Sequence, residues 1–186
     1  MLLKIGIALI VVIAIFLVVA ATRPASYRVT RKTLVSAPPA VAYAQVVDFH
    51  KWPAWSPWAK LDPAMKTTYS GAPEGTGAVY AWTGNDKVGE GRMTILEARP
   101  AEVVNVKLEF MRPMTAINQS SFTFTPAPGG TGIVWTMDGH NNFMAKAFSV
   151  FMDFEKMVGD DFERGLANLK AVSEAQQPAP ISAVAH

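Results

Sequence analysis

The chain has 186 residues, half of them hydrophobic, with 17 Lys or Arg against 15 Asp or Glu. That length allows one ordinary domain with an appendage and excludes a multidomain enzyme. With 17% charged residues and a net charge of +2, the sequence has no basic stripe, so we expect no nucleic-acid partner. Cysteine is absent, and His50, His140 and His186 lack metal-binding spacing. We therefore expect no disulfide, no metal and no cofactor.

A long uncharged apolar segment lies near the N-terminus. Residues 5–22 are almost all Ile, Val, Leu and Ala. As a helix they would span about 27 Å, close to the thickness of the hydrocarbon core of a bilayer. We therefore expect residues 1–23 to form a single-pass anchor in the plasma (inner) membrane. The alternative is a cleaved signal peptide, because Val19, Ala20 and Ala21 form a passable cleavage site.

The charges beside this segment leave its orientation open. Lys4 precedes it, and Arg23, Arg28 and Arg31 follow it. Basic residues favour the cytoplasmic side of a membrane span. Because basic residues lie at both ends of the segment, this rule does not decide on which side of the membrane the soluble domain lies.

The domain itself is expected over residues 24–175. Pro24 ends the anchor helix because proline lacks a backbone N–H. At the other end, residues 176–186 contain two prolines, small residues and no Asp, Glu, Lys or Arg. This composition is typical of a disordered terminal tail.

The first elements of the domain are a strand and two short helical segments. Residues 27–35 have the pattern of a strand. The pair Pro38 and Pro39 is suited to open a helix that continues through Val47. A second helical segment, interrupted by prolines, follows it.

Residues 66–138 predict a meander of antiparallel strands. Val104, Val106, Leu108 and Phe110 alternate with polar residues, which indicates a strand buried on one face. Residues 116–124 alternate in the same way. Clusters of Gly and Pro separate these segments, and repeated glycines suit a strongly curved sheet.

The last third predicts one long amphipathic helix over residues 142–175. Its apolar face has residues every three or four positions, namely Ala147, Phe151, Phe154, Val158, Phe162, Leu166, Leu169 and Val172. Such a helix would be about 50 Å long and would cross the whole sheet. The expected fold class is therefore α+β, with a curved antiparallel sheet packed on a long C-terminal helix and preceded by one transmembrane helix.

Four segments join this order of elements in carrying a family resemblance: SAPPAVAYAQVVDFHKWPAWSPWAKLDP at residues 36–63, LEFMRP at 108–113, GGTGIVW at 129–135 and DDFERGLANLK at 160–170. With them the chain resembles the START and polyketide-cyclase superfamily (SRPBCC), whose helix-grip fold is shared with the birch-pollen allergen. In detail it looks like the membrane-anchored bacterial polyketide cyclase/dehydrase-like proteins. The resemblance implies the fold and leaves the chemistry open, because the superfamily includes lipid carriers, cyclases and co-chaperones.

The resemblance also implies a cavity between the sheet and the long helix, lined mainly by apolar side chains. The residues expected to bind a ligand there come from three parts of the chain: Tyr80, Trp82, Phe110, Phe122 and Trp135 from the sheet, Phe148, Phe151 and Met152 from the helix, and Trp55 and Trp58 near the helical pair. For each of them, packing in an ordinary core is the alternative.

Asn118 and Ser120 complete the predicted site. They occupy the positions of the alternation that Phe122 and Phe124 assign to the concave face. A buried amide and hydroxyl need hydrogen-bond partners. Either they bind a ligand carbonyl or hydroxyl, or they bond to each other or to water.

The start of the predicted long helix has a second apolar stripe. Residues 143–154 read FMAKAFSVFMDF, and Met144, Phe148 and Met152 lie beside the main stripe. The stripe could contact the tryptophan-rich segment, form a gate to the cavity or reach the bilayer. Our hypothesis is that this end of the helix faces the membrane and admits an apolar ligand.

No residue pair is a compelling catalytic centre. Asp48, Tyr43, Glu90, Arg92 and His140 are the available acid or base groups. Glu90 and Arg92 could pair with each other, His140 suits a solvated turn, and Asp48 suits a helix cap. We therefore predict a membrane-tethered binder of a hydrophobic small molecule or lipid. The alternatives are a polyketide cyclase or dehydratase and a co-chaperone-like interaction module.

Overall fold

The computed structural model describes residues 1–176, and the predicted tail of residues 176–186 lies outside the described residues from residue 177 onward. Its elements in chain order are α1 (Leu2–Thr22), β1 (Ser26–Val35), α2 (Pro39–Val46), the 3-10 helix η1 (Phe49–Ala54), β2 (Lys66–Gly71), β3 (Ala78–Thr83), β4 (Glu90–Arg99), β5 (Val103–Arg112), β6 (Ala116–Ala127), β7 (Gly130–His140), α3 (Phe143–Phe148) and α4 (Phe154–Ala175). Asp48 caps η1, since its carboxylate accepts from the His50 amide at 2.9 Å. The predicted cap is confirmed.

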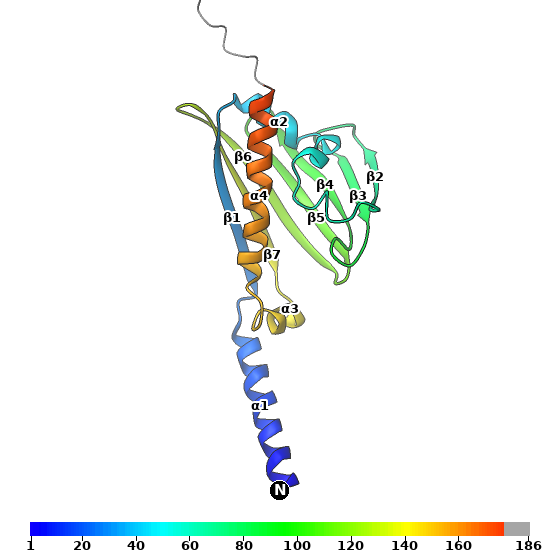
Figure 1. Ribbon diagram of the computed structural model, residues 1–186, viewed down its shortest axis with the longest axis vertical. Helices are drawn as coiled ribbons and strands as arrows, with labels where there is room; N and C mark the ends of the chain where they lie inside the picture. Colours follow the sequence, from blue (N-terminus) through cyan, green and yellow to red (C-terminus); the bar gives the residue numbers. More distant parts are fainter. Residues whose placement is uncertain (177–186) are drawn as a thin grey trace, which may run out of the picture.

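Seven strands form one curved antiparallel sheet in the order β1-β7-β6-β5-β4-β3-β2 (Figure 1). Strands β2 to β7 are the predicted meander, and β1 joins it beside β7. The register of β4 and β5 shifts between Ile95 and Glu97, and such irregularities bend a strand. Together with the terminal helix, this is the predicted helix-grip arrangement.

The predicted single helix over residues 142–175 is wrong in one respect, because two helices occupy it. The Asn142 side chain accepts from the Ala145 amide and begins α3, and the Asp153 side chain accepts from the Lys156 amide and begins α4. Each N-cap satisfies a backbone donor that has no partner within the helix, so a second cap starts a second helix. The periodicity of the apolar residues continued through this break and concealed it.

Helix α4 packs across the concave face of the sheet and runs beside β1 (Figure 1). Its buried residues include Val158, Phe162, Leu166 and Leu169. Gly165 allows close approach, because a Cβ there would lie 2.8 Å from the Trp135 ring. By contrast, Phe151 and Phe154, which the periodicity placed on the same buried face, are exposed.

Helix α1 projects away from the domain, and α3 lies at the end of the domain from which α1 leaves (Figure 1). The span Leu3–Thr22 has a mean hydropathy of 3.1 and is almost entirely uncovered by the rest of the chain. It is long and apolar enough to cross a membrane, and a signal sequence would have the same properties.

Candidate functional site: an apolar cavity under the C-terminal helix

Aromatic side chains fill one part of the space between the sheet and α4. The Trp135 ring stacks on Phe162 at 3.8 Å between centroids and on Phe122 at 4.7 Å. Trp55 and Trp52 continue this cluster toward α2, 4.7 Å apart. The Trp52 and Trp55 indoles donate to the backbone oxygens of Val46 and Gln45, respectively. These hydrogen bonds fix large rings in a solid core.

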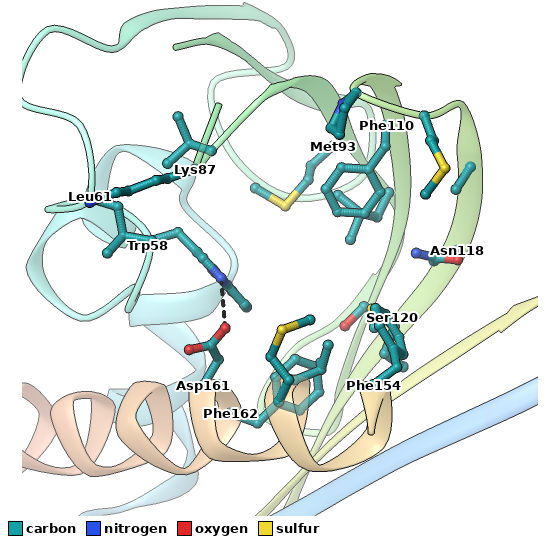
Figure 2. A pocket seen from close by; sticks show the side chains of 18 of the residues that line it. Trp58, Leu61, Lys87, Met93, Phe110, Asn118, Ser120, Phe154, Asp161 and Phe162 are labelled. Atoms are coloured by element: carbon teal, nitrogen blue, oxygen red, sulfur yellow. Dashed lines mark hydrogen bonds between the residues drawn. The ribbon is translucent and has the colours of Figure 1, made fainter. Parts of the chain in front are cut away.

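Another part of this space is hollow. A cavity of about 1390 Å³ lies between the sheet, the segment after η1 and the start of α4. Figure 2 shows it bounded by Trp58, Leu61 and Lys87 on one side, by Met93, Phe110 and Asn118 on the sheet side, and by Phe154 and Phe162 below. Ligand sites of this kind are usually about 300 to 1,000 Å³, so the volume is ample for a lipid-sized guest.

Ten of the twelve predicted site residues line this cavity: Trp58, Tyr80, Trp82, Phe110, Asn118, Ser120, Trp135, Phe148, Phe151 and Met152. The remaining two, Trp55 and Phe122, are fully buried in the aromatic core and do not line it. For those two, core packing is what the structure shows. The alternation that placed Phe122 on the concave face was correct, but the core fills that part of the face.

One polar pair inside the cavity leaves a donor available. The Tyr27 hydroxyl donates to Asn118 Oδ1 at 3.1 Å. The Asn118 amide nitrogen has no hydrogen-bond acceptor among residues 1–176, and in Figure 2 it points into the hollow. The oxygen of the Asn118 amide already accepts a hydrogen bond, whereas its N–H groups face an apolar space. These N–H groups can therefore donate to an acceptor atom of a bound ligand.

Ser120 differs from Asn118 because the fold already satisfies it. Its hydroxyl donates to the Thr136 carbonyl at 3.0 Å and accepts from the Trp135 indole at 2.8 Å. The predicted partners of Ser120 were a ligand, or else Asn118 or water, whereas the structure gives it Thr136 and Trp135. Its role in the structure is to orient the Trp135 ring that separates the core from the cavity.

Several residues that line the cavity were not predicted from the sequence. Met93 and Leu108 face each other across β4 and β5, and Leu108 lies opposite Asn118 in β6. The alternation in β5 already placed Leu108 on the same face as Phe110, so that signal was available. Tyr27 and Asp161 had no such signal, because they reach the cavity from β1 and α4 only through the tertiary fold.

Asp161 is held at the cavity wall by a tryptophan. The Trp58 indole donates to Asp161 Oδ2 at 3.2 Å, as the dashed line in Figure 2 shows. Arg164 forms an ion pair with the same carboxylate. The bond joins the segment after η1 to α4, so Trp58 connects two cavity walls and also presents its ring to the hollow.

The acid and base groups considered from sequence lie apart. Arg92 pairs with Glu109 at 2.8 Å and Glu90 with Arg112 at 3.5 Å, so the predicted Glu90–Arg92 pair is wrong. Residues two apart on a strand share a face, but residues directly across from each other lie closer. His140 ends β7, is exposed and lines the rim of the cavity.

The ionisation of Tyr80, which lines the cavity, makes the stability of the protein depend on pH. Burial, assisted by the nearby Tyr69, raises the pKa of Tyr80 to about 12. Because the unfolded chain releases this proton near pH 10, the folded state is favoured below that pH, and stability falls as the pH rises from about 10 to about 12. We expect Tyr80→Phe to flatten this loss. The check is the urea midpoint of both proteins at pH 9 and pH 11, and an equal loss in both would contradict the assignment.

A curved antiparallel sheet packed on a long C-terminal helix, with an apolar cavity between them, is the helix-grip fold. Residues 26–174 match the family described as polyketide cyclase / dehydrase and lipid transport. The chain belongs to this family. A comparison with curated protein sequences gave no significant match.

Several solved structures share this fold. The di-domain ARO/CYC StfQ from the steffimycin biosynthetic pathway has a TM-score of 0.60 at 12% identity, covering 81% of this chain and 51% of that one. The Aha1 dimer from Colwellia psychrerythraea has a TM-score of 0.58 at 15% identity over 82% of this chain and 99% of that one. Ara h 8.0201 has a TM-score of 0.53 at 15% identity, covering 81% and 96%. At such identities the likeness is one of fold.

Proposed function

We propose that this protein is a membrane-tethered binder of an apolar small molecule or lipid, held in the cavity between the sheet and α4. The observation that carries the proposal is the hollow of about 1390 Å³ beside a core whose aromatic residues are otherwise closely packed. A large, mainly apolar pocket with a few polar groups is the usual form of a binding site for a small molecule. The family description, which includes lipid transport, supports the same class of ligand.

Asn118 indicates which polar group the ligand carries. Its amide nitrogen donates to no group in the described chain, so a carbonyl, ester or carboxyl oxygen would satisfy it. We propose a guest with a long apolar body and one such oxygen. Residues 1–23, in this proposal, remain attached and hold the domain at the plasma membrane.

The test uses the full chain in phospholipid vesicles with a fatty acid that carries a photoreactive diazirine in its acyl chain. After irradiation, peptide mapping separates labels on β3 to β6, which border the cavity, from labels on α1. Label on α1 reports contact with bulk lipid and serves as an internal control. We expect label at both places in the unaltered chain.

Leu108→Trp is expected to remove the cavity label and to spare the label on α1. Leu108 lines the cavity, and the larger indole would occupy the guest's space, which we expect to weaken binding at least about tenfold, equivalent to about 1.4 kcal/mol. The matched control is Leu96→Trp, because Leu96 is 50% exposed on β4 and does not line this cavity. Label confined to α1 in the unaltered chain would contradict the proposal and favour an interaction module.

A further inference from the structure

The end of the domain nearest α1 carries a patch of exposed apolar side chains. Phe148 is 51% exposed, Phe151 77% and Met152 52%, and Phe143 and Met144 of α3 are about half exposed. The ten residues 143–152 contain a single charged residue, Lys146. A group of exposed apolar side chains of this kind at one end of a domain marks an interaction surface.

The position of Phe151 identifies the partner as a bilayer. The Phe151 ring stacks on Phe16 of α1 with 5.6 Å between centroids. Phe16 lies six residues before Thr22, the last residue of α1, which places it about 9 Å below the end of the helix. If α1 crosses the membrane, Phe16 lies within the apolar layer, and Phe151 must lie there with it.

The charges around the patch agree with this depth. Lys146 is half buried on α3, and Arg23 follows α1 directly and is exposed. Long basic side chains near a membrane surface extend their charged ends toward the headgroups. Asp153, the acidic residue that ends the patch, is engaged as the N-cap of α4.

Three residues of the patch also line the cavity. Phe148, Phe151 and Met152 border it, and so do Arg23 and Pro24 at the end of α1. The hollow under α4 and the surface near the membrane are therefore continuous. We infer that α3 and the link to α4 are immersed in one leaflet, and that the mouth of the cavity opens below the headgroups.

This inference rests on the proposed function and makes its ligand more specific. A guest that enters below the headgroups passes from the leaflet into the cavity without crossing water. The ligand is then a molecule that already resides in the membrane, such as a lipid or its acyl-bearing precursor. The break between α3 and α4, where Asp153 caps a new helix, forms the rim of this opening.

The depth can be measured directly because the chain has no cysteine. Phe151→Cys and Phe148→Cys, each labelled with an environment-sensitive NBD fluorophore, are reconstituted in vesicles that contain nitroxide-bearing phospholipids. The matched control is Leu34→Cys, since Leu34 is 48% exposed and lies on β1 about 26 Å from Ser26, the residue nearest α1. The intact mass of the extracted chain establishes beforehand that residues 1–23 are retained.

We expect the probes at positions 148 and 151 to be quenched by the nitroxide lipids and protected from iodide, and the probe at position 34 to show the reverse. Iodide quenching at 148 and 151 as strong as at 34 would overturn the immersion. This outcome is independent of the cavity label, so a failure here and a failure of ligand binding are distinguishable.

A second measurement tests the mouth itself. A carboxylate at the rim should hinder the passage of an apolar guest, so Met152→Glu is expected to slow labelling of the cavity by the diazirine fatty acid several-fold. The control is Met111→Glu, because Met111 is 48% exposed and does not border the cavity. Equal rates in the two variants would overturn the position of the mouth.

Discussion

Phe162→Ala is expected to lower the free energy of unfolding by about 3 to 5 kcal/mol, the range for a large buried aromatic residue. Phe162 is 1% exposed, and its ring stacks on Trp135 at 3.8 Å. Removing it leaves a void between α4 and the sheet that Trp135 cannot close, since the hydrogen bond to Ser120 holds the indole. Such a loss is a large fraction of the 5 to 15 kcal/mol that stabilise an ordinary domain.

The measurement is urea unfolding of the full chain in detergent, followed by tryptophan fluorescence. Met157→Ala is the matched control, because Met157 lies on the same helix and is 46% exposed. We expect its effect to stay below about 1 kcal/mol. Equal losses for the two variants would mean that the core does not lie where Phe162 meets Trp135.

Gly139→Ala is expected to destabilise the protein by about 1 to 3 kcal/mol and to weaken labelling of the cavity by the fatty acid. Gly139 pairs with Tyr27 in β1 and with Asn118 in β6. A Cβ at this position would meet both Asn118 Oδ1 and the Tyr27 hydroxyl. The hydrogen bond between those two groups, 3.1 Å long, would have to open, and Asn118 would no longer present its amide to the guest.

Gly132→Ala provides the contrast on the same strand. Its Cβ would lie 3.7 Å from the nearest atom, the Thr125 oxygen, which is an ordinary contact. Alanine in a strand is favoured over glycine by about 0.5 to 1 kcal/mol, so we expect no loss of stability and unchanged labelling. The two alanine variants should therefore differ in sign, and a similar loss in both would contradict the role given to Gly139.

Much of the fold was predictable because local patterns determine it. The period-two alternation in residues 103–110 and 116–124 predicted β5 and β6, since a strand with one buried face requires that period. Periodicity also located the buried face of α4. It failed at Ser149–Asp153, where the apolar spacing continues but Asp153 caps a new helix. A helix cap depends on a single side chain, so its signal in the sequence is weak. The apolar periodicity around it is strong and predicted one continuous helix.

The site was less predictable than the fold. Aromatic content identified Trp58, Tyr80 and Phe110, which line the cavity, but the same criterion selected Trp55 and Phe122, which are in the core. A large apolar side chain has the same sequence signature in a filled interior and in a hollow one. Ligand binding by these residues remains a proposal that the photolabelling tests.

The sequence alone determined the concave faces of the strands, because backbone geometry links them to a period of two along the chain. It also determined the apolar N-terminal helix, through an uninterrupted apolar run, and the class of fold, through the order of the elements and the family resemblance. Only the tertiary structure decided where the interior is filled and where it is open. That depends on how Trp135, Phe162 and Phe122 stack across three elements and on how Tyr27 satisfies the oxygen of Asn118. These contacts join residues far apart in the chain, and no local pattern contains them.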